Sequence, residues 1–125
     1  MFFLTICGET RGKNLLCQPD VATALFAAAR HYHEKQNWFL RLMLLLPDHL
    51  HALLALAPDL KLGGLVGNWK RYIRRKVDIA WQKDFFDHRL RSDESWEEKA
   101  AYIRANPVRA GLIDENKTWP FLIMH

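Results

Sequence analysis

The chain has 125 residues, enough for one two-layer hydrophobic core and too few for two independent ones, so we expect a single domain over residues 1–125. Half of the residues are hydrophobic and five are tryptophan, which argues against disorder, and the net charge of +4 directs the search for partners toward polyanions. No apolar segment approaches the ~18 uninterrupted residues of a membrane span, and the two cysteines lie far from any CxxC spacing. We therefore expect a soluble, cytoplasmic protein with free thiols and no membrane contact.

Hydrophobic periodicity and turn residues divide the chain into alternating strands and helices. The expected elements are a strand over Phe2–Cys7, a helix that begins at Pro19, a strand over Asn37–Leu46, a strand from about His49, a helix from about Leu65 to Trp81, a strand over Phe85–Arg91 and a helix from Ser95 through Ala105. We expect the tail Val108–His125 to be extended and to pack over the sheet. This order predicts an α+β fold with a ferredoxin-like antiparallel four-stranded sheet packed with helices and one extra C-terminal helix.

Two histidines, His49 and His51, interrupt an otherwise apolar segment that follows the turn Pro47-Asp48. On a strand, side chains two positions apart point to the same face, so both imidazoles are expected to project together with Leu50 behind them. Two adjacent imidazoles can hold one divalent metal ion. The alternative is that the spacing arises by chance and that the histidines are only hydrogen-bonded within the sheet.

The helix expected from Leu65 carries four cations, Lys70, Arg71, Arg74 and Arg75, at positions i, i+1, i+4 and i+5. This spacing gathers them into one basic stripe beside Tyr72, which favours contact with a phosphate backbone. The alternative is a solvated helix face with no partner.

The last expected helix places Tyr102 and Asn106 four residues apart, while Trp96, Ala100 and Ile103 form its buried side. A tyrosine hydroxyl is a poor nucleophile unless a metal ion or a cation lies beside it. The amide oxygen of Asn106 could complete the coordination of an ion held by the two histidines. The alternative is that Tyr102 merely packs.

The chain resembles the HUH single-tyrosine transposases of the insertion-sequence type, and most of all the REP-associated tyrosine transposases. The matching segments, in order, are LLLPDHLHALL, WQKDFFDHRLR, and YIRANPVRAGLI followed by WPF; the opening FFLTIC also fits. The resemblance extends from about Phe3 to Phe121.

The resemblance implies that His49 and His51 bind Mg²⁺ or Mn²⁺, with Asn106 as a third ligand, and that Tyr102 is the nucleophile. The implied reaction is metal-dependent cleavage and rejoining of single-stranded DNA through a 5′-phosphotyrosine, on hairpins formed by short palindromic repeats. Lys70, Arg71, Arg74 and Arg75 are the candidate DNA contacts, and relatives act as monomers or as homodimers that exchange tyrosine helices.

Two other functions stay open at this point: a hairpin-binding protein with weak or lost catalysis, and a metal-dependent phosphodiesterase without a covalent step. The sequence gives no mechanistic role to His88 or Arg91.

Overall fold

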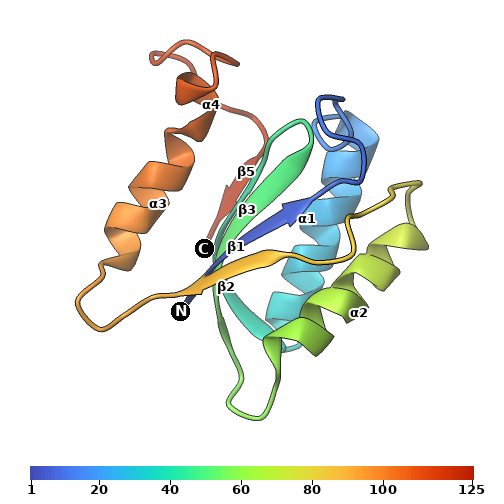
Figure 1. Ribbon diagram of the computed structural model, residues 1–125, viewed down its shortest axis with the longest axis vertical. Helices are drawn as coiled ribbons and strands as arrows, with labels where there is room; N and C mark the ends of the chain where they lie inside the picture. Colours follow the sequence, from blue (N-terminus) through green and yellow to red (C-terminus); the bar gives the residue numbers. More distant parts are fainter.

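A computed structural model describes residues 1–125 as a five-stranded antiparallel sheet with helices on both faces (Figure 1). The strands follow the order β4-β1-β3-β2-β5 across the sheet. The elements are β1 (Phe2–Cys7), α1 (Pro19–Glu34), β2 (Trp38–Leu45), β3 (His49–Leu56), α2 (Leu62–Arg74), β4 (Phe86–Arg89), α3 (Trp96–Arg104), α4 (Asn106–Arg109) and β5 (Leu122–Met124). The first four strands, with α1 and α2 as crossovers, form the ferredoxin-like β-α-β-β-α-β unit, so the predicted α+β class is confirmed.

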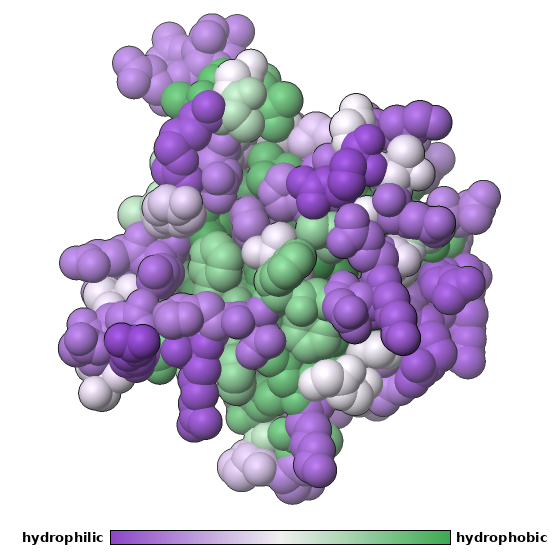
Figure 2. Space-filling model, viewed as in Figure 1, coloured by the Kyte–Doolittle hydropathy of each residue, from purple (hydrophilic) through white to green (hydrophobic).

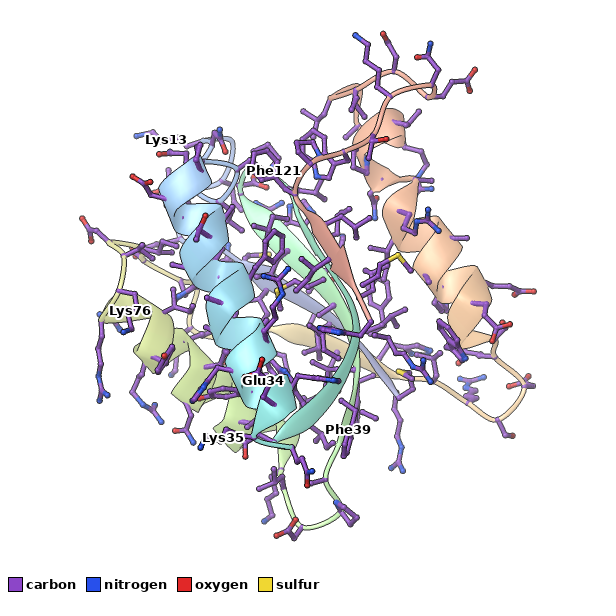
Figure 3. All side chains as sticks on the ribbon, turned by 180° about the vertical axis from the view of Figure 1, so that it is seen from behind. Lys13, Glu34, Lys35, Phe39, Lys76 and Phe121 are labelled. Atoms are coloured by element: carbon purple, nitrogen blue, oxygen red, sulfur yellow. The ribbon has the colours of Figure 1, made fainter.

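The two faces of the sheet carry different helices, as the view from behind also shows (Figure 3). On β3, Leu50, Ala52 and Leu54 join a cluster of 22 buried residues that includes the inner sides of α1 and α2. Leu53 points the other way and joins a cluster of six with Ala100 and Ile103 of α3. We call this second side, which also carries His49 and His51 by strand alternation, the α3 face.

Helix α3 begins and ends within one residue of its predicted bounds, Ser95 and Ala105. The hydroxyl of Ser95 accepts a hydrogen bond from the backbone N–H of Glu98, as an N-cap does. Trp96, Ala100 and Ile103 pack on the sheet, as expected, and the guanidinium of Arg41 on β2 lies 4.6 Å above the Trp96 ring. These contacts hold α3 against the sheet.

The C-terminal tail differs from the expected extended segment. After a break at Ala105 a second short helix, α4, runs from Asn106 to Arg109, and Pro107 fits there because it occupies the first turn, where no N–H donor is needed. The tail then adds β5 beside β2, which gives the sheet one strand more than the four expected.

Helix α2 and strand β4 also differ from their expected bounds. Helix α2 begins three residues earlier than Leu65 and ends at Arg74 rather than Trp81, and Trp81 instead forms an isolated bridge with Gly8. Strand β4 covers only Phe86–Arg89 of the expected Phe85–Arg91, and Phe86 is 68% exposed. Phe85 alone packs against the large core.

Lys70 is the one charged residue among the buried residues of the protein, with 8% of its surface exposed. Its ammonium donates to the backbone carbonyl of Gln82 at 3.0 Å, of Asp84 at 3.4 Å and of Lys83 at 3.5 Å. Burial lowers the pKa of Lys70, while the nearby Asp84 opposes that change. The lysine therefore ties α2 to the segment that leads into β4.

No helix of this structure has both the length and the apolar character needed to cross a bilayer.

Replacing Lys70 with methionine should lower the free energy of unfolding by about 1–3 kcal/mol, because the carbonyls of residues 82–84 lose their donor while the apolar stem is kept. Urea denaturation measures this change. Arg74→Met on the exposed side of the same helix is the control and should stay within about 0.5 kcal/mol of the parent protein. Equal effects of the two substitutions would show that Lys70 has no anchoring role.

Candidate functional site

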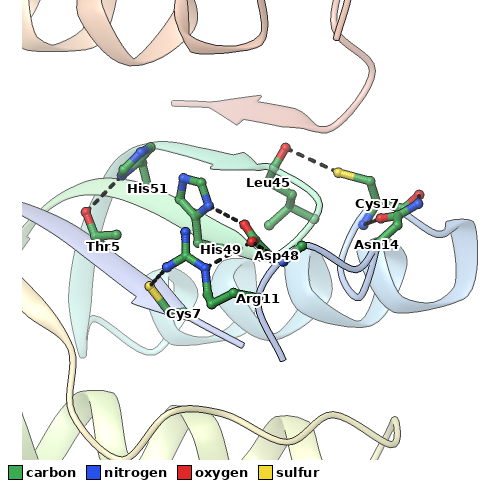
Figure 4. A network of polar contacts seen from close by, with 10 residues as sticks. Thr5, Cys7, Arg11, Asn14, Cys17, Leu45, Asp48, His49 and His51 are labelled. Atoms are coloured by element: carbon green, nitrogen blue, oxygen red, sulfur yellow. Dashed lines mark hydrogen bonds and ion pairs between the residues drawn. The ribbon is translucent and has the colours of Figure 1, made fainter. Parts of the chain in front are cut away.

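The turn before β3 is fixed by Asp48, whose carboxylate reaches three donors (Figure 4). Oδ2 accepts from the Arg11 side chain at 2.9 Å and from the backbone N–H of Gly12 at 2.8 Å. Oδ1 lies 2.7 Å from Nδ1 of His49. Partial burial alone would raise the pKa of Asp48, but these hydrogen bonds and the Arg11 charge outweigh it and hold the pKa at about 2. Asp48 is therefore a permanent anion beside His49.

The two imidazoles are each held through Nδ1. His49 donates to Asp48, and Nδ1 of His51 lies 3.0 Å from the Thr5 hydroxyl on the neighbouring strand β1. The ring centroids are 5.0 Å apart and the rings are nearly perpendicular. With the proton of His49 on Nδ1, its Nε2 presents a lone pair, which is how a carboxylate commonly orients a metal-binding histidine.

The imidazole of His51 is uncharged at neutral pH. The pKa of His51 is lowered to about 4, and burial is the largest cause. The neighbouring His49 and the charge of Arg109 lower the pKa further, while a backbone hydrogen bond with Leu4 raises it. An uncharged imidazole is the form that binds metal ions. At neutral pH no proton has to leave this ring before it can act as a ligand.

Tyr102 projects from α3 with 57% of its surface exposed. It lines a pocket of about 490 Å³ together with Phe3, His88, Glu98 and Lys99. Phe3 connects this pocket to the histidines, because its ring lies 5.2 Å from that of His51. Hydrophobic side chains gather in the middle of the visible surface, over the region where β1 and β4 run beside α3 (Figure 2). The structure thus brings Tyr102 and the histidine pair to the same face of the sheet.

Arg109 on α4 is a site residue that sequence reasoning missed. Its guanidinium carbon lies 4.2 Å from the centroid of the Tyr102 ring, and its Nη2 donates to the Tyr102 carbonyl at 2.7 Å. The only signal was the motif NPVRAGL itself, where Arg109 follows Asn106 by three residues. Spacing across a helix break gave no geometric reason to choose it.

Asn106 begins α4, and Nη2 of Arg109 donates to its Oδ1 at 3.1 Å. The other amide atom, Nδ2, is buried without a hydrogen-bond partner. Such a group is costly unless a further partner satisfies it.

No cluster of three His, Cys, Asp or Glu side chains forms a metal site. The two anchored imidazoles nevertheless offer nitrogen ligands of the kind that divalent metal ions accept.

The four predicted DNA contacts do not stay together. Arg71, Arg74 and Arg75 are exposed at the end of α2, but α2 packs on the sheet face opposite to the histidines. Lys70 departs from the expected basic stripe, because its ammonium is buried against the backbone of residues 82–84. Helical spacing correctly places Lys70 next to the arginines, but spacing alone does not show which of these cations faces the core.

His88 and Arg91 have structural partners. Nε2 of His88 lies 2.9 Å from Oε1 of Glu94, and the same carboxylate oxygen accepts from the Arg91 backbone N–H at 2.9 Å. Lys99 also approaches Glu94, at 3.6 Å. Glu94 therefore holds the link between β4 and α3, which positions the helix that carries Tyr102.

The chain is similar in sequence to two transposase-like proteins, while no protein-family model matches it. A protein of Haemophilus influenzae, named as a candidate REP-associated tyrosine transposase, is 25% identical over an alignment of 142 positions that spans the whole chain and 80% of that protein. The REP-associated tyrosine transposase of Escherichia coli is 28% identical over 86 residues, which is 64% of this chain and half of that protein.

Two solved structures share the fold. A REP-associated tyrosine transposase bound to a REP hairpin superposes with a TM-score of 0.81 at 22% identity, over 97% of this chain and 74% of that one. A candidate transposase from Deinococcus radiodurans gives a TM-score of 0.58 at 17% identity, over 82% of this chain and 88% of that one. The chain is thus REP-associated tyrosine transposase-like in sequence and in fold, which confirms the resemblance that its motifs indicated.

Proposed function

We propose that residues 1–125 act as one catalytic domain that cleaves and rejoins single-stranded DNA at hairpins, with Tyr102 as the nucleophile. The observation that carries the proposal is the pair of anchored imidazoles, His49 and His51, on the same face as the exposed Tyr102. The hairpin substrate is suggested by the REP hairpin bound to the structurally similar transposase.

In the proposed reaction the phenol of Tyr102 loses its proton and its oxygen bonds to phosphorus. The bond between phosphorus and the 3′ oxygen breaks, and that oxygen takes up a proton to become a free 3′ hydroxyl. The 5′ phosphate stays joined to the tyrosine, so the energy of the phosphodiester is kept. The 3′ hydroxyl of another strand can then attack the phosphotyrosine bond, which releases the tyrosine and joins two DNA ends without ATP.

The residues that would hold Mg²⁺ or Mn²⁺ are His49 and His51, with the amide oxygen of Asn106 as third ligand. When bound, such an ion polarises the phosphodiester and stabilises charge on the leaving oxygen. The chain's own part is to hold both rings through Asp48 and Thr5 and to keep His51 uncharged.

We further propose that Arg71, Arg74 and Arg75 bind phosphates of the hairpin away from the cleavage site. They are exposed cations, but the sheet separates their helix from Tyr102. Such contacts position DNA without carrying chemistry.

The central experiment incubates the protein with Mn²⁺ and a single-stranded oligonucleotide that contains a hairpin. We expect a denaturant-resistant protein–DNA adduct on a gel, absent in Tyr102→Phe because that variant keeps the ring but has no attacking oxygen. A mobility shift without an adduct would instead indicate a hairpin-binding protein, and cleavage without an adduct a phosphodiesterase.

The neutral state of His51 predicts how the metal-free protein responds to pH. The folded pKa of about 4 lies below the ordinary 6.5, so between these values the unfolded chain binds a proton that the folded chain does not. Stability should therefore rise from pH 4 to pH 6.5, by at most about 3 kcal/mol from this residue.

Urea denaturation with EDTA present, at pH 4.5 and pH 7, measures the rise for the parent protein and for His51→Gln. The variant should show the smaller rise. An equal rise in both would mean that His51 is not held neutral by the fold.

The double variant Arg71→Ala, Arg74→Ala should weaken hairpin binding and flatten its dependence on salt, because each phosphate that no longer meets a cation lowers the slope by roughly 0.7–0.9. The rate of adduct formation at saturating DNA should stay unchanged. Fluorescence anisotropy at several salt concentrations measures the slope. The matched control removes two exposed cations of α1 and its end, Arg30→Ala with Lys35→Ala. A slope equal to the control's would exclude α2 as a DNA-binding surface.

A further inference from the structure

Arg109 contacts both groups that the proposed reaction takes from the C-terminal part of the chain. Its guanidinium lies over the Tyr102 ring, 4.2 Å from the centroid, and its Nη2 donates to the Asn106 side chain at 3.1 Å. The same Nη2 bonds the Tyr102 carbonyl at 2.7 Å. One cation therefore holds the nucleophile by its ring and its backbone, across the break between α3 and α4.

A structural role alone would account for part of this arrangement. The last carbonyls of a helix lack intrahelical donors, and an arginine beyond the end can supply one. That role uses only one nitrogen of the guanidinium. Both side-chain hydrogen bonds of Arg109 leave from Nη2, so Nε and Nη1 have no hydrogen-bond partner within the protein, and the residue is exposed.

The position of Arg109 matches what a phosphoryl-transfer site needs beside a tyrosine. A cation over an aromatic face is attracted to the ring electrons, and the attraction grows as the phenol develops negative charge. A guanidinium also presents planar, charge-assisted donors that fit phosphate oxygens. A guanidinium beside the phenol is therefore chemically suited to both groups that change charge during attack on phosphorus, the phenol and the phosphate.

We propose that Arg109 is a positioning residue for the proposed DNA cleavage: it fixes the Tyr102 ring and offers its free N–H groups to the phosphate that Tyr102 attacks. This inference rests on the proposed function and adds to it a residue outside the histidine pair. Because the guanidinium aligns the two reacting groups, its loss should slow the chemical step more than it weakens binding of the hairpin.

The test compares Arg109→Ala and Arg109→Lys with the parent protein, using a hairpin oligonucleotide and Mn²⁺ in single-turnover reactions at saturating protein. We expect Arg109→Ala to slow adduct formation roughly 100-fold, as the loss of one aligned donor does elsewhere. The dissociation constant of the hairpin should change less than about threefold. Arg109→Lys, which keeps the charge without the planar donors, should recover part of the rate, and free guanidinium ion at a non-denaturing concentration should accelerate Arg109→Ala alone.

The matched control is Arg104→Ala, which removes an exposed cation from the last turn of α3. It should keep both the rate and the affinity. Thermal unfolding of each variant shows whether α4 has stayed folded.

Three results would overturn the inference. The first is an unchanged rate of adduct formation in Arg109→Ala, and the second is a slower rate matched by an equal loss of hairpin affinity. The third is a slower rate that free guanidinium does not restore and that is just as slow in Arg109→Lys. If the parent protein itself forms no adduct, the proposed function fails and the inference fails with it. If the parent forms the adduct and Arg109→Ala does so equally fast, only the inference fails.

Discussion

The period of two along β3 is the constraint on which the rest of this molecule depends. Leu50, Ala52 and Leu54 must enter the large core beneath α1 and α2, so His49 and His51 are forced to the α3 face. A shift of one residue in the pairing of β3 with β1 would bury both imidazoles and expose the leucines. The hydrophobic free energy that fixes this register therefore also fixes the histidine pair, without any further interaction to direct it.

On the α3 face, several side chains each hold one functional group in a single orientation. Asp48, itself held by Arg11 and Gly12, orients His49, while Thr5 meets His51. On the opposite wall, the Glu94 network fixes the approach to α3. The sheet and α3 thus both line the pocket in which Tyr102 is exposed.

The sheet separates the two surfaces to which we assign DNA binding and chemistry. The exposed arginines of α2 and the phenol of α3 cannot meet one phosphate, since their helices pack on opposite faces. Binding of a hairpin and cleavage of the DNA would then depend on separate surfaces. Lys70 belongs to neither surface, because it anchors the segment between α2 and β4.

The sequence by itself determined the antiparallel α+β fold, the common face of His49 and His51, and the start and buried side of α3. These features follow from local periodicity and from neighbours within a few residues. Only the tertiary structure decided that Lys70 is buried, that the tail forms α4 and β5, and that Arg109 stacks on Tyr102. Each of these depends on contacts between segments distant in sequence or across a helix break, where neither a period of two nor a period of 3.6 residues specifies which side chains meet.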